Sequence, residues 1–455
     1  MHKIIVFGTG KYYREKKEYL KQFDILCLVD NDEAKQGCEI DGIKVVSPEQ
    51  ITEMNYDYIC IMASRQDEII TQLLAMGVKE GRILKYFEIG LLNENVNNYF
   101  DVRELAESEI VIFSHLMNYT GAAIALYNFA KVLKKAGYKC VVFSMFDGPL
   151  KHCYEDIGVT VYEEDFISIQ NSALMRFLSK KRLIVCNTIV FRYIIEDIAD
   201  LNVPVMWWIH EALGFHFCNF KSYKIRHNKN LHVYGVGELV QLMYKEKFLD
   251  NNIKSLLFMV DDNKSLKISS GEKDKKTFAI IGGIYEGKGQ DVFVDAIRLL
   301  PREYQVKCSF YIIGKPVNEK YYDLIKKESQ EIPELEILGE LSHKQLEEKY
   351  RDIDVVVCAS RNESMSMVVV EALQNKKCCI VSKAAGISRF IEEKKNGLLL
   401  ENVDAQILAN KMMWVIDNAD FVKNIEENGY KIYKKNFSRE VFEQKVRDIV
   451  VDIID

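Results

Sequence analysis

The sequence lacks the features that mark a membrane-spanning, disulfide-bonded or nucleic-acid-binding protein. No apolar run approaches the roughly 18 to 20 residues that a bilayer-spanning helix needs. The net charge is −6, so we expect no nucleic acid as a partner. The 11 cysteines are odd in number and form no Cys-x-x-Cys pair, which favours buried, reduced thiols. We therefore expect a cytoplasmic protein, with any membrane contact peripheral and at the inner face.

A signal-peptide shape is also missing, because the stretch from Met1 to Gly8 leads directly into a strand-like run. The composition is ordinary for a globular protein, with 48% hydrophobic and 28% charged residues. A chain of 455 residues suggests about two to four domains. Its core can be large, so folding needs neither a metal nor a disulfide.

Apolar strand-like runs alternate with amphipathic helical stretches, which predicts an α/β fold with parallel sheets. We expect domains at 1–95, 104–265 and 274–436, and one amphipathic helix at 437–455 that packs back on the second domain. The expected strands are Ile4–Phe7, Ile25–Val29, Lys44–Val46, Tyr58–Met62, Ile110–Ser114, Cys140–Ser144, Leu183–Cys186, Val205–Ile209, Leu231–Tyr234, Phe278–Ile281, Cys308–Ile313, Val355–Cys358, Cys379–Val381 and Leu398–Leu400. The expected apolar stripe of the last helix is Val441, Phe442, Val446, Ile449 and Val450.

Glu363 and Glu371 are the most informative pair of residues. They follow the strand-like run 355–358 and span a loop and the start of a helical stretch that ends near Asn375. Free N–H groups at such a helix start favour phosphate. An ionised carboxylate accepts hydrogen bonds, so Glu371 suits the hydroxyls of a ribose or sugar. The alternative is a pair of solvated surface acids.

A glycine-rich loop with a lysine, Gly282 to Asp291, follows the first strand of the third block and precedes a helix at 292–300. Glycines let a backbone approach an anion closely, and Lys288 adds positive charge at the mouth of the loop. The order suits a diphosphate, although the spacing is not that of a Walker A loop. The alternative is an ordinary turn with an exposed lysine.

Two features of the second block lie where ligands collect in open α/β sheets, at the carboxyl ends of strands. Gly121 opens the helix that follows the strand at 110–114, and His210 comes at the end of the strand at 205–209. Gly121 would let a ligand lie against the helix start, and Glu211 would orient the histidine. The alternatives are a plain βα turn and a structural histidine.

The first block carries half of a dinucleotide fingerprint. Gly8 and Gly10 follow the first strand, Asp30 ends the second, and Tyr13 stands where the third glycine is expected. A bound nucleotide or sugar, a scaffold role and an NAD-dependent oxidoreductase domain all remain open. In the second block the basic residues Lys221, Lys224, Arg226, His227 and Lys229 are candidates for an anionic membrane or for a solvated turn.

Taken together, these motifs resemble the retaining, nucleotide-sugar-dependent glycosyltransferases of family 4, which have the GT-B fold. The resemblance covers Ile110 to the C-terminus, about three quarters of the chain. The motifs are Thr120-Gly121-Ala122, His210-Glu211, Gly287-Lys288-Gly289-Gln290-Asp291, Leu338-Gly339, Ser360, Glu363 with Glu371, Ala385-Gly386 and Asn396-Gly397-Leu398-Leu399. The resemblance implies two Rossmann-like domains in GT-B arrangement, beside a small N-terminal Rossmann-like domain.

The resemblance also implies roles for individual residues. His210, Glu363 and Lys288 would be catalytic: Glu363 contacts the transferred sugar, Lys288 pairs with the diphosphate, and His210 faces sugar and acceptor. Glu371 would hold the ribose hydroxyls. The remaining implied donor-binding positions are Gly121, Gly283, Arg361, Ser364, Met365, Ser366 and Met367.

Two departures from the family pattern stand out. Gly283 occupies the place of an arginine that clamps the diphosphate in many relatives, and Arg361 or Lys383 is expected to substitute for it. Ser364, Met365 and Ser366 fill a stretch that is glycine-rich in many relatives.

The resemblance implies a glycosyltransferase (EC 2.4 class) that moves a sugar, with retention, from a nucleotide-sugar to a glycan, lipid-linked or protein acceptor. The expected pathway is cell-surface polysaccharide or glycoconjugate biosynthesis. Neither a cofactor nor a metal is expected, apart from the open question of a nucleotide in the first block. The alternative is a catalytically silent GT-B partner subunit that binds substrate and supports another glycosyltransferase.

Overall fold

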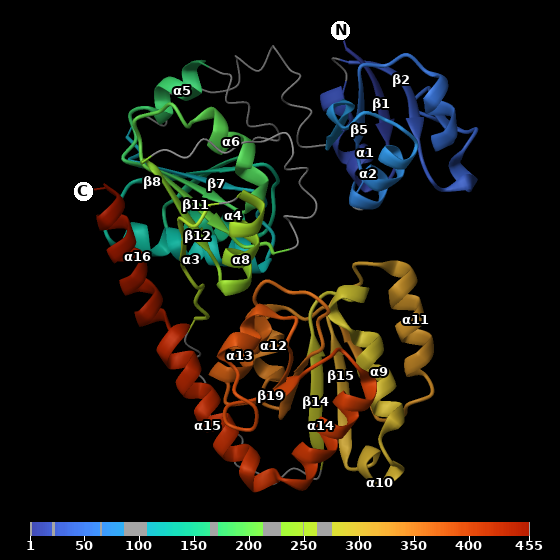
Figure 1. Ribbon diagram of the computed structural model, residues 1–455, viewed down its shortest axis with the longest axis vertical. Helices are drawn as coiled ribbons and strands as arrows, with labels where there is room; N and C mark the ends of the chain where they lie inside the picture. The colour runs from blue at the N-terminus through green and yellow to red at the C-terminus, as the bar shows by residue number, and fades with distance from the viewer. Residues whose placement is uncertain are drawn as a thin grey trace. The chain divides into compact units, whose positions relative to one another are not determined.

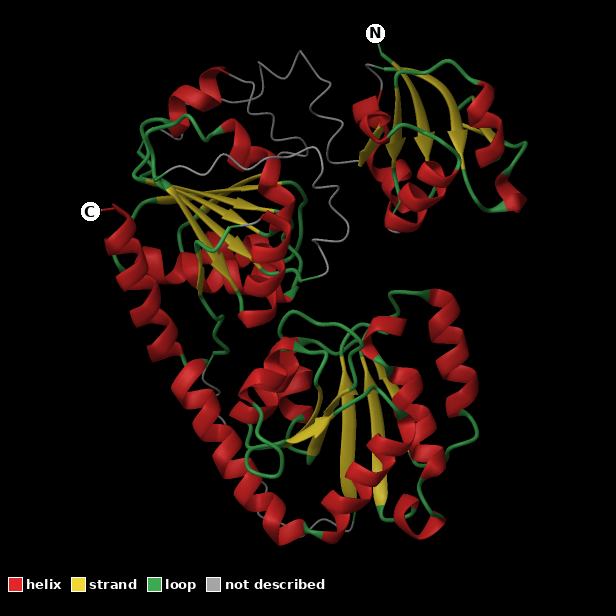
Figure 2. Cartoon of the chain, viewed as in Figure 1, coloured by secondary structure: helices red, strands yellow, loops and turns green. Residues whose placement is uncertain are grey.

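The computed structural model describes residues 2–20, 23–63, 66–85, 107–163, 172–212, 229–248, 250–261 and 275–454. The chain forms two compact units (Figures 1 and 2). The first comprises Met1–Glu104 and Glu163–Phe177, and the second comprises Leu105–Tyr162 and Leu178–Asp455.

The first unit contains a six-stranded sheet in the order β3-β4-β2-β1-β5-β6. Its pairings are parallel except that β3 runs antiparallel to β4, so the sheet is mixed. The apolar side chains of β1 and β5 are buried because both faces of these central strands are covered. The elements are β1 (Lys3–Phe7), α1 (Lys11–Lys16), β2 (Asp24–Val29), β3 (Glu39–Ile40), β4 (Ile43–Val46), β5 (Tyr58–Ile61), α2 (Gln66–Ala75) and β6 (Ile83–Lys85).

The second unit holds two sheets. The first has seven strands in the order β13-β12-β11-β10-β7-β8-β9, and its pairings from β13 to β8 are parallel. The elements are β7 (Ile110–Ser114), α3 (Gly121–Lys135), β8 (Cys140–Ser144), α4 (Leu150–Asp156), β9 (Thr160–Glu163), α5 (Ser172–Leu178, shared between the two units), β10 (Leu183–Asn187), α6 (Arg192–Asp197), β11 (Val205–Ile209), β12 (Leu231–Gly235), α8 (Glu238–Phe248) and β13 (Ile253–Ser255).

The other sheet of this unit has six parallel strands in the order β16-β15-β14-β17-β18-β19. The elements are β14 (Lys276–Ile281), α9 (Gln290–Leu299), α10 (Arg302–Gln305), β15 (Cys308–Ile313), α11 (Glu319–Ser329), β16 (Leu335–Gly339), α12 (His343–Lys349), β17 (Val355–Cys358), α13 (Met367–Gln374), β18 (Cys378–Ser382), β19 (Leu398–Leu400), α14 (Ala405–Asp417) and α15 (Ala419–Asn436). The predicted α/β fold is confirmed, although the sheet of the first unit is mixed and not fully parallel.

The tail forms α16 (Arg439–Ile454), which packs on α3 of the seven-stranded sheet (Figure 1). Four residues of the predicted apolar stripe are buried, namely Phe442, Val446, Ile449 and Val450. Val441 was assigned wrongly to this stripe, because its side chain is 38% exposed. It precedes Phe442 by one position, and neighbouring helix positions point about 100° apart.

Candidate active site

A 3-10 turn, Glu286–Lys288, carries Lys288 between β14 and α9. Gly289 follows in the left-handed region, with φ of 75°. A Cβ atom there would collide with the carbonyl oxygen of Ala359, so glycine is required for this close approach. The approach brings the turn against the loop after β17, where Glu363 lies.

Lys288 and Glu363 form an ion pair across these two loops, with 2.7 Å between Nζ and Oε1. The other carboxylate oxygen of Glu363 accepts a 2.7 Å hydrogen bond from the hydroxyl of Ser360. Burial disfavours the charge of Lys288, but Glu363, together with Tyr285 and Cys358, outweighs burial and raises the lysine pKa. A fixed positive charge therefore lies beside a carboxylate in a largely buried setting.

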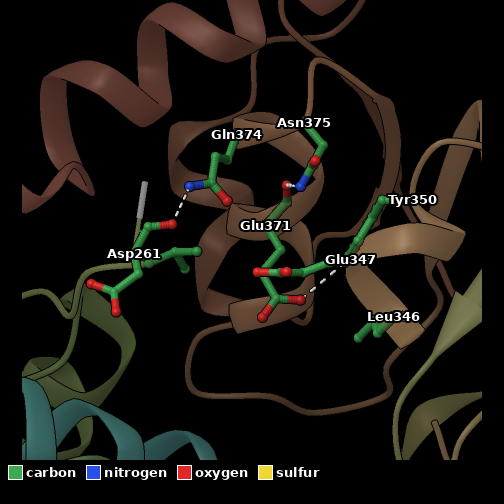
Figure 3. A pocket seen from close by; sticks show the side chains of 8 residues that line it. Asp261, Leu346, Glu347, Tyr350, Glu371, Gln374 and Asn375 are labelled. Carbon is green, nitrogen blue, oxygen red and sulfur yellow. Dashed lines mark hydrogen bonds between the residues drawn. The ribbon is translucent and has the colours of Figure 1, made fainter. Parts of the chain in front are cut away.

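Glu371 is the fifth residue of α13, one turn behind the helix start. Its Oε2 accepts a 3.1 Å hydrogen bond from the hydroxyl of Tyr350 (dashed in Figure 3). Burial raises the pKa of Tyr350, so this hydroxyl stays protonated as a donor. Glu371 lines a pocket together with Val260, Asp261, Leu346, Glu347, Tyr350, Gln374 and Asn375 (Figure 3).

His210 follows β11 at the carboxyl edge of the seven-stranded sheet. Its ring lies 4.5 Å from the Trp208 ring, centroid to centroid. Burial lowers the pKa of His210 to about 3, so the imidazole is neutral near pH 7. Its Nε2 atom is buried without a hydrogen-bond partner in the described structure. Glu211 accepts hydrogen bonds from the backbone N–H groups of Ile189 and His210, at 3.0 and 3.2 Å, and so fixes the backbone that carries the ring.

Contacts within the second unit bring the edge of the seven-stranded sheet to the loop before α13. The backbone N–H of Ala212 donates a 2.6 Å hydrogen bond to the Ser364 hydroxyl. A Cβ atom on Gly121 would lie 4.0 Å from the end of the Met367 side chain. The Met365 side chain reaches Gly237, where a Cβ atom would lie only 2.6 Å away. Ser366 is buried and is the N-cap residue of α13, although its side chain makes no capping hydrogen bond.

The two cations expected to replace the missing arginine are both paired. Arg361 binds Asp291 through both terminal nitrogens, and Lys383 pairs with Glu401. At Gly283 a Cβ atom would lie 2.7 Å from a methyl carbon of Val317. A larger residue at this position would therefore have to move Val317, which is 60% exposed.

The structure adds residues that the sequence gave no reason to select. Tyr350, which binds Glu371, has no motif around it. Thr188 lies directly after β10 with φ of 78°, an uncommon conformation for a residue with a β-branched side chain. The side-chain oxygens of Thr188 and Asn187 are buried without hydrogen-bond partners in the described structure. The sequence alone could not have identified these two residues, because burial and missing partners are visible only in the structure.

In the first unit the candidate ribose acid is engaged within the fold. Asp30 accepts hydrogen bonds from the Thr9 backbone at 3.0 Å and from Lys35 at 3.1 Å. Tyr13, at the expected third glycine, is 1% exposed. Nucleotide binding by this unit stays a prediction, and the packing of Tyr13 gives the position a structural role.

The basic cluster lies mostly outside the described residues, since only Lys229 belongs to them, at an exposed turn before β12. Among the residues that the structure describes, no group of three His, Cys, Asp or Glu side chains could hold a metal ion. None of the helices in these ranges is long and apolar enough to cross a bilayer.

The second unit consists of two parallel-sheet domains, and the second of these carries a cationic glycine-rich loop and a carboxylate-bearing helix. This arrangement is the architecture of sugar transferases of the GT-B class. Residues 107–248 match the family described as glycosyl-transferase family 4, and residues 261–432 match glycosyl transferases group 1. These two segments therefore carry the domains of a glycosyltransferase of family 4 with the GT-B fold. Residues 1–84 match the N-terminal family described as C2185-like.

Individual relatives agree with this assignment. An uncharacterized glycosyltransferase of Methanocaldococcus jannaschii is 27% identical over 213 residues, which cover 47% of this chain and 58% of the relative. The structure of Anabaena HepE in complex with UDP and glucose has a TM-score of 0.65 at 16% identity, over 76% of this chain and 99% of HepE. A glycosyltransferase from Rickettsia africae has a TM-score of 0.63 at 16% identity, over 76% of this chain and 99% of that chain. These two structures show a shared fold.

The partly buried His115 and the buried His210, each at the carboxyl end of a strand, predict acid sensitivity. Burial lowers the pKa of His115 to about 4 and that of His210 to about 3, against about 6.5 in an unfolded chain. As the pH falls below 6.5, the unfolded chain takes up protons that the folded chain refuses, so the free energy of unfolding decreases. Urea titrations at pH 7.5 and 5.5 should show this loss, and it should be smaller for His210→Gln. An equal loss in the variant would contradict the burial of a neutral imidazole.

Proposed function

We propose that the chain transfers a sugar, with retention, from a nucleotide-sugar to a glycan, lipid-linked or protein acceptor, in cell-surface polysaccharide or glycoconjugate biosynthesis. The matches to two glycosyltransferase families give the reaction class. The observation that carries the proposal is the Lys288–Glu363 ion pair at the loop just before α13, the helix that carries Glu371 one turn after its start. It combines a cation for a diphosphate with carboxylates for sugar and ribose hydroxyls.

The chemistry follows from where charge develops. Glycosyl transfer passes through an oxocarbenium-like state, and negative charge builds on the departing diphosphate. Lys288 and the backbone N–H groups from Ser364 to Met367, at and just before the start of α13, would bind this charge more strongly in the transition state than in the ground state. When Lys288 turns to the phosphate, Glu363 is released to accept a hydrogen bond from the sugar.

Retention requires the acceptor to attack from the face that the diphosphate leaves. We propose that an oxygen of the departing diphosphate takes the acceptor proton on that face, so the paired carboxylates of a retaining glycosidase are not needed. The neutral imidazole of His210 would accept a hydrogen bond from a sugar or acceptor hydroxyl. Gly121, close to Met367, would leave room for the donor phosphate or the acceptor.

To identify the donor, the purified chain is incubated with a mixture of five nucleotide-sugars. These are UDP-glucose, UDP-galactose, UDP-N-acetylglucosamine, GDP-mannose and dTDP-rhamnose. Chromatography then resolves the UDP, GDP and dTDP that are released. We expect one nucleoside diphosphate to accumulate, and UDP is the first to examine because HepE was solved with UDP. The absence of release with every donor, with and without acceptor glycans, would contradict an active transferase.

A silent partner subunit is the second candidate, and the observation that favours it is Gly283, since a diphosphate clamp of the relatives is missing there. A silent subunit would bind a nucleotide-sugar, seen as a thermal shift, without releasing nucleoside diphosphate. Binding together with release would remove this candidate. A peripheral contact with an anionic membrane is tested by flotation with vesicles of anionic and of neutral lipid.

Glu371 supplies a prediction about binding. Glu371→Ala should raise the Kd for UDP by roughly tenfold or more, because hydrogen bonds to a charged group contribute about 1.5–3 kcal/mol. Calorimetric titration measures this, and inorganic pyrophosphate serves as the control ligand because it has no ribose. An unchanged Kd for UDP in the variant would show that Glu371 does not hold the ribose.

A further inference from the structure

The glycine-rich loop and the loop that carries Glu363 are joined by a second contact, separate from the Lys288–Glu363 ion pair. Arg361 donates to both carboxylate oxygens of Asp291, at 3.0 and 2.6 Å. The same side chain also donates to the backbone carbonyl of Glu286, and the Arg361 backbone N–H donates to the carbonyl of Gly287 at 2.9 Å. One residue of the Glu363 loop thus holds three points of the glycine-rich loop and of the helix behind it.

Asp291 is itself fixed in place. It lies in the first turn of α9, and Oδ1 accepts a 2.7 Å hydrogen bond from the hydroxyl of Tyr321, which in turn accepts the Asp291 N–H at 2.9 Å. Burial disfavours the Asp291 charge, but hydrogen bonds from Arg361 and Tyr321 outweigh burial and lower its pKa. The carboxylate is therefore a firm anchor, and the two-pronged pairing with a guanidinium fixes direction as well as distance.

The contact between Arg361 and Asp291 lies close in the chain to both Glu363 and Lys288. Arg361 is two residues from Glu363, and the Gly287 carbonyl that it binds belongs to the residue before Lys288. When a donor diphosphate draws Lys288 away from Glu363, the ion pair between the loops is lost. The contact through Arg361 and Asp291 involves neither of these side chains and can persist.

We propose that Arg361 and Asp291 are a positioning pair, which holds Lys288 and Glu363 in register while the donor separates them, and that Arg361 is not a ligand of the diphosphate. This inference rests on the proposed roles of Lys288 and Glu363. It replaces the expectation that Arg361 substitutes for the arginine missing at Gly283. Both terminal nitrogens of Arg361 are engaged by Asp291, so donor binding would have to break a two-pronged ion pair.

Asp291→Asn distinguishes the two possible roles of Arg361, as a positioning residue or as a ligand of the diphosphate, by its effects on kcat and on the donor KM. A positioning pair predicts that Asp291→Asn lowers kcat by roughly 10- to 100-fold, as expected when reacting groups shift by about 1 Å, with a smaller change in KM for the donor. If Arg361 instead binds the diphosphate, Asp291→Asn frees the guanidinium and the donor KM falls. Turnover is measured with the five-donor mixture named above, and then with the donor that is consumed.

Three further variants sharpen the test. Arg361→Gln should lower kcat at least as much as Asp291→Asn, because it also removes the hydrogen bond to the Glu286 carbonyl. The double variant should be no worse than Arg361→Gln alone, because both substitutions remove the contact between Arg361 and Asp291. Arg361→Lys keeps the charge but not the two-pronged geometry, so it should resemble Arg361→Gln; near-normal activity would instead favour simple charge binding and overturn the proposal. Asp295→Asn is the control, since Asp295 lies one turn later on α9 and pairs with Arg298 at an exposed position.

A measurement without any donor separates this inference from the proposed function. Hydrogen exchange of the amides at 286–289 and 361–364 should be faster in Asp291→Asn than in the wild type and in Asp295→Asn. The exchange of amides outside these two loops, and the melting temperature, should be the same in all three proteins. Unchanged exchange in both loops would overturn the positioning pair even if sugar transfer is confirmed. Faster exchange with no donor consumed by the wild type would support the pair and count against the proposed function alone.

Discussion

Lys288→Ala should lower kcat by roughly 10²-fold, the effect expected when one group that stabilises developing charge is removed. The Nζ atom lies 2.7 Å from Glu363 and is the cation next to the loop where we place the diphosphate. Its loss should also raise the Kd for the nucleoside diphosphate. Turnover of the identified donor and a titration with the product nucleotide measure the two effects.

Loss of stability is the competing explanation for Lys288→Ala, because the variant leaves Glu363 without its ion-pair partner in a largely buried position. Assays should therefore run well below the melting temperature of the variant. Lys288→Arg keeps the charge and should retain more activity than alanine. Lys327→Ala, on the exposed side of α11, is the matched control and should be as active as the wild type. A near-normal rate in Lys288→Ala would remove Lys288 from the mechanism.

Glu363→Gln should also lower kcat by about 10²-fold, but it should not weaken nucleotide binding as Lys288→Ala does. The Glu363 carboxylate accepts a hydrogen bond from Lys288, so neutralising this carboxylate frees the lysine for the diphosphate. The Kd for the nucleoside diphosphate should therefore stay the same or fall. Titration of Lys288→Ala and Glu363→Gln side by side measures this difference. Weaker nucleotide binding in both variants would contradict the separate assignment of Lys288 to phosphate and Glu363 to sugar.

Most of the strands that the sequence predicted well lie inside the sheets, although β19 is an edge strand. The runs at β7, β8, β11, β15, β17 and β19 have the predicted bounds. Both faces of such strands are covered, so the strands appear as continuous apolar runs. The strands that the sequence did not predict, β3, β6, β9, β13 and β16, are short or lie at or next to a sheet edge. In β13 and β16 most residues are at least partly exposed, which removes the apolar signal.

The candidate site shows a similar division. The sequence could point to four site residues because each lies near the end of a strand or helix that has a recognisable local sequence pattern. These residues are His210, Lys288, Glu363 and Glu371. The partners that fix them are remote in the chain. Glu363 is 75 residues from Lys288, Tyr350 is 21 from Glu371, and Asp291 is 70 from Arg361. No local pattern predicts which partner a charged side chain takes, so only the structure shows that Arg361 is already engaged by Asp291.

The most direct test of the central claim is a calorimetric titration of UDP, GDP and dTDP into the wild type, Lys288→Ala and Lys327→Ala. The account predicts that one of the three nucleotides binds the wild type and Lys327→Ala with equal affinity, and binds Lys288→Ala at least tenfold more weakly. Equal affinity in all three proteins, or no binding of any nucleotide to the wild type, would contradict a donor site built around Lys288.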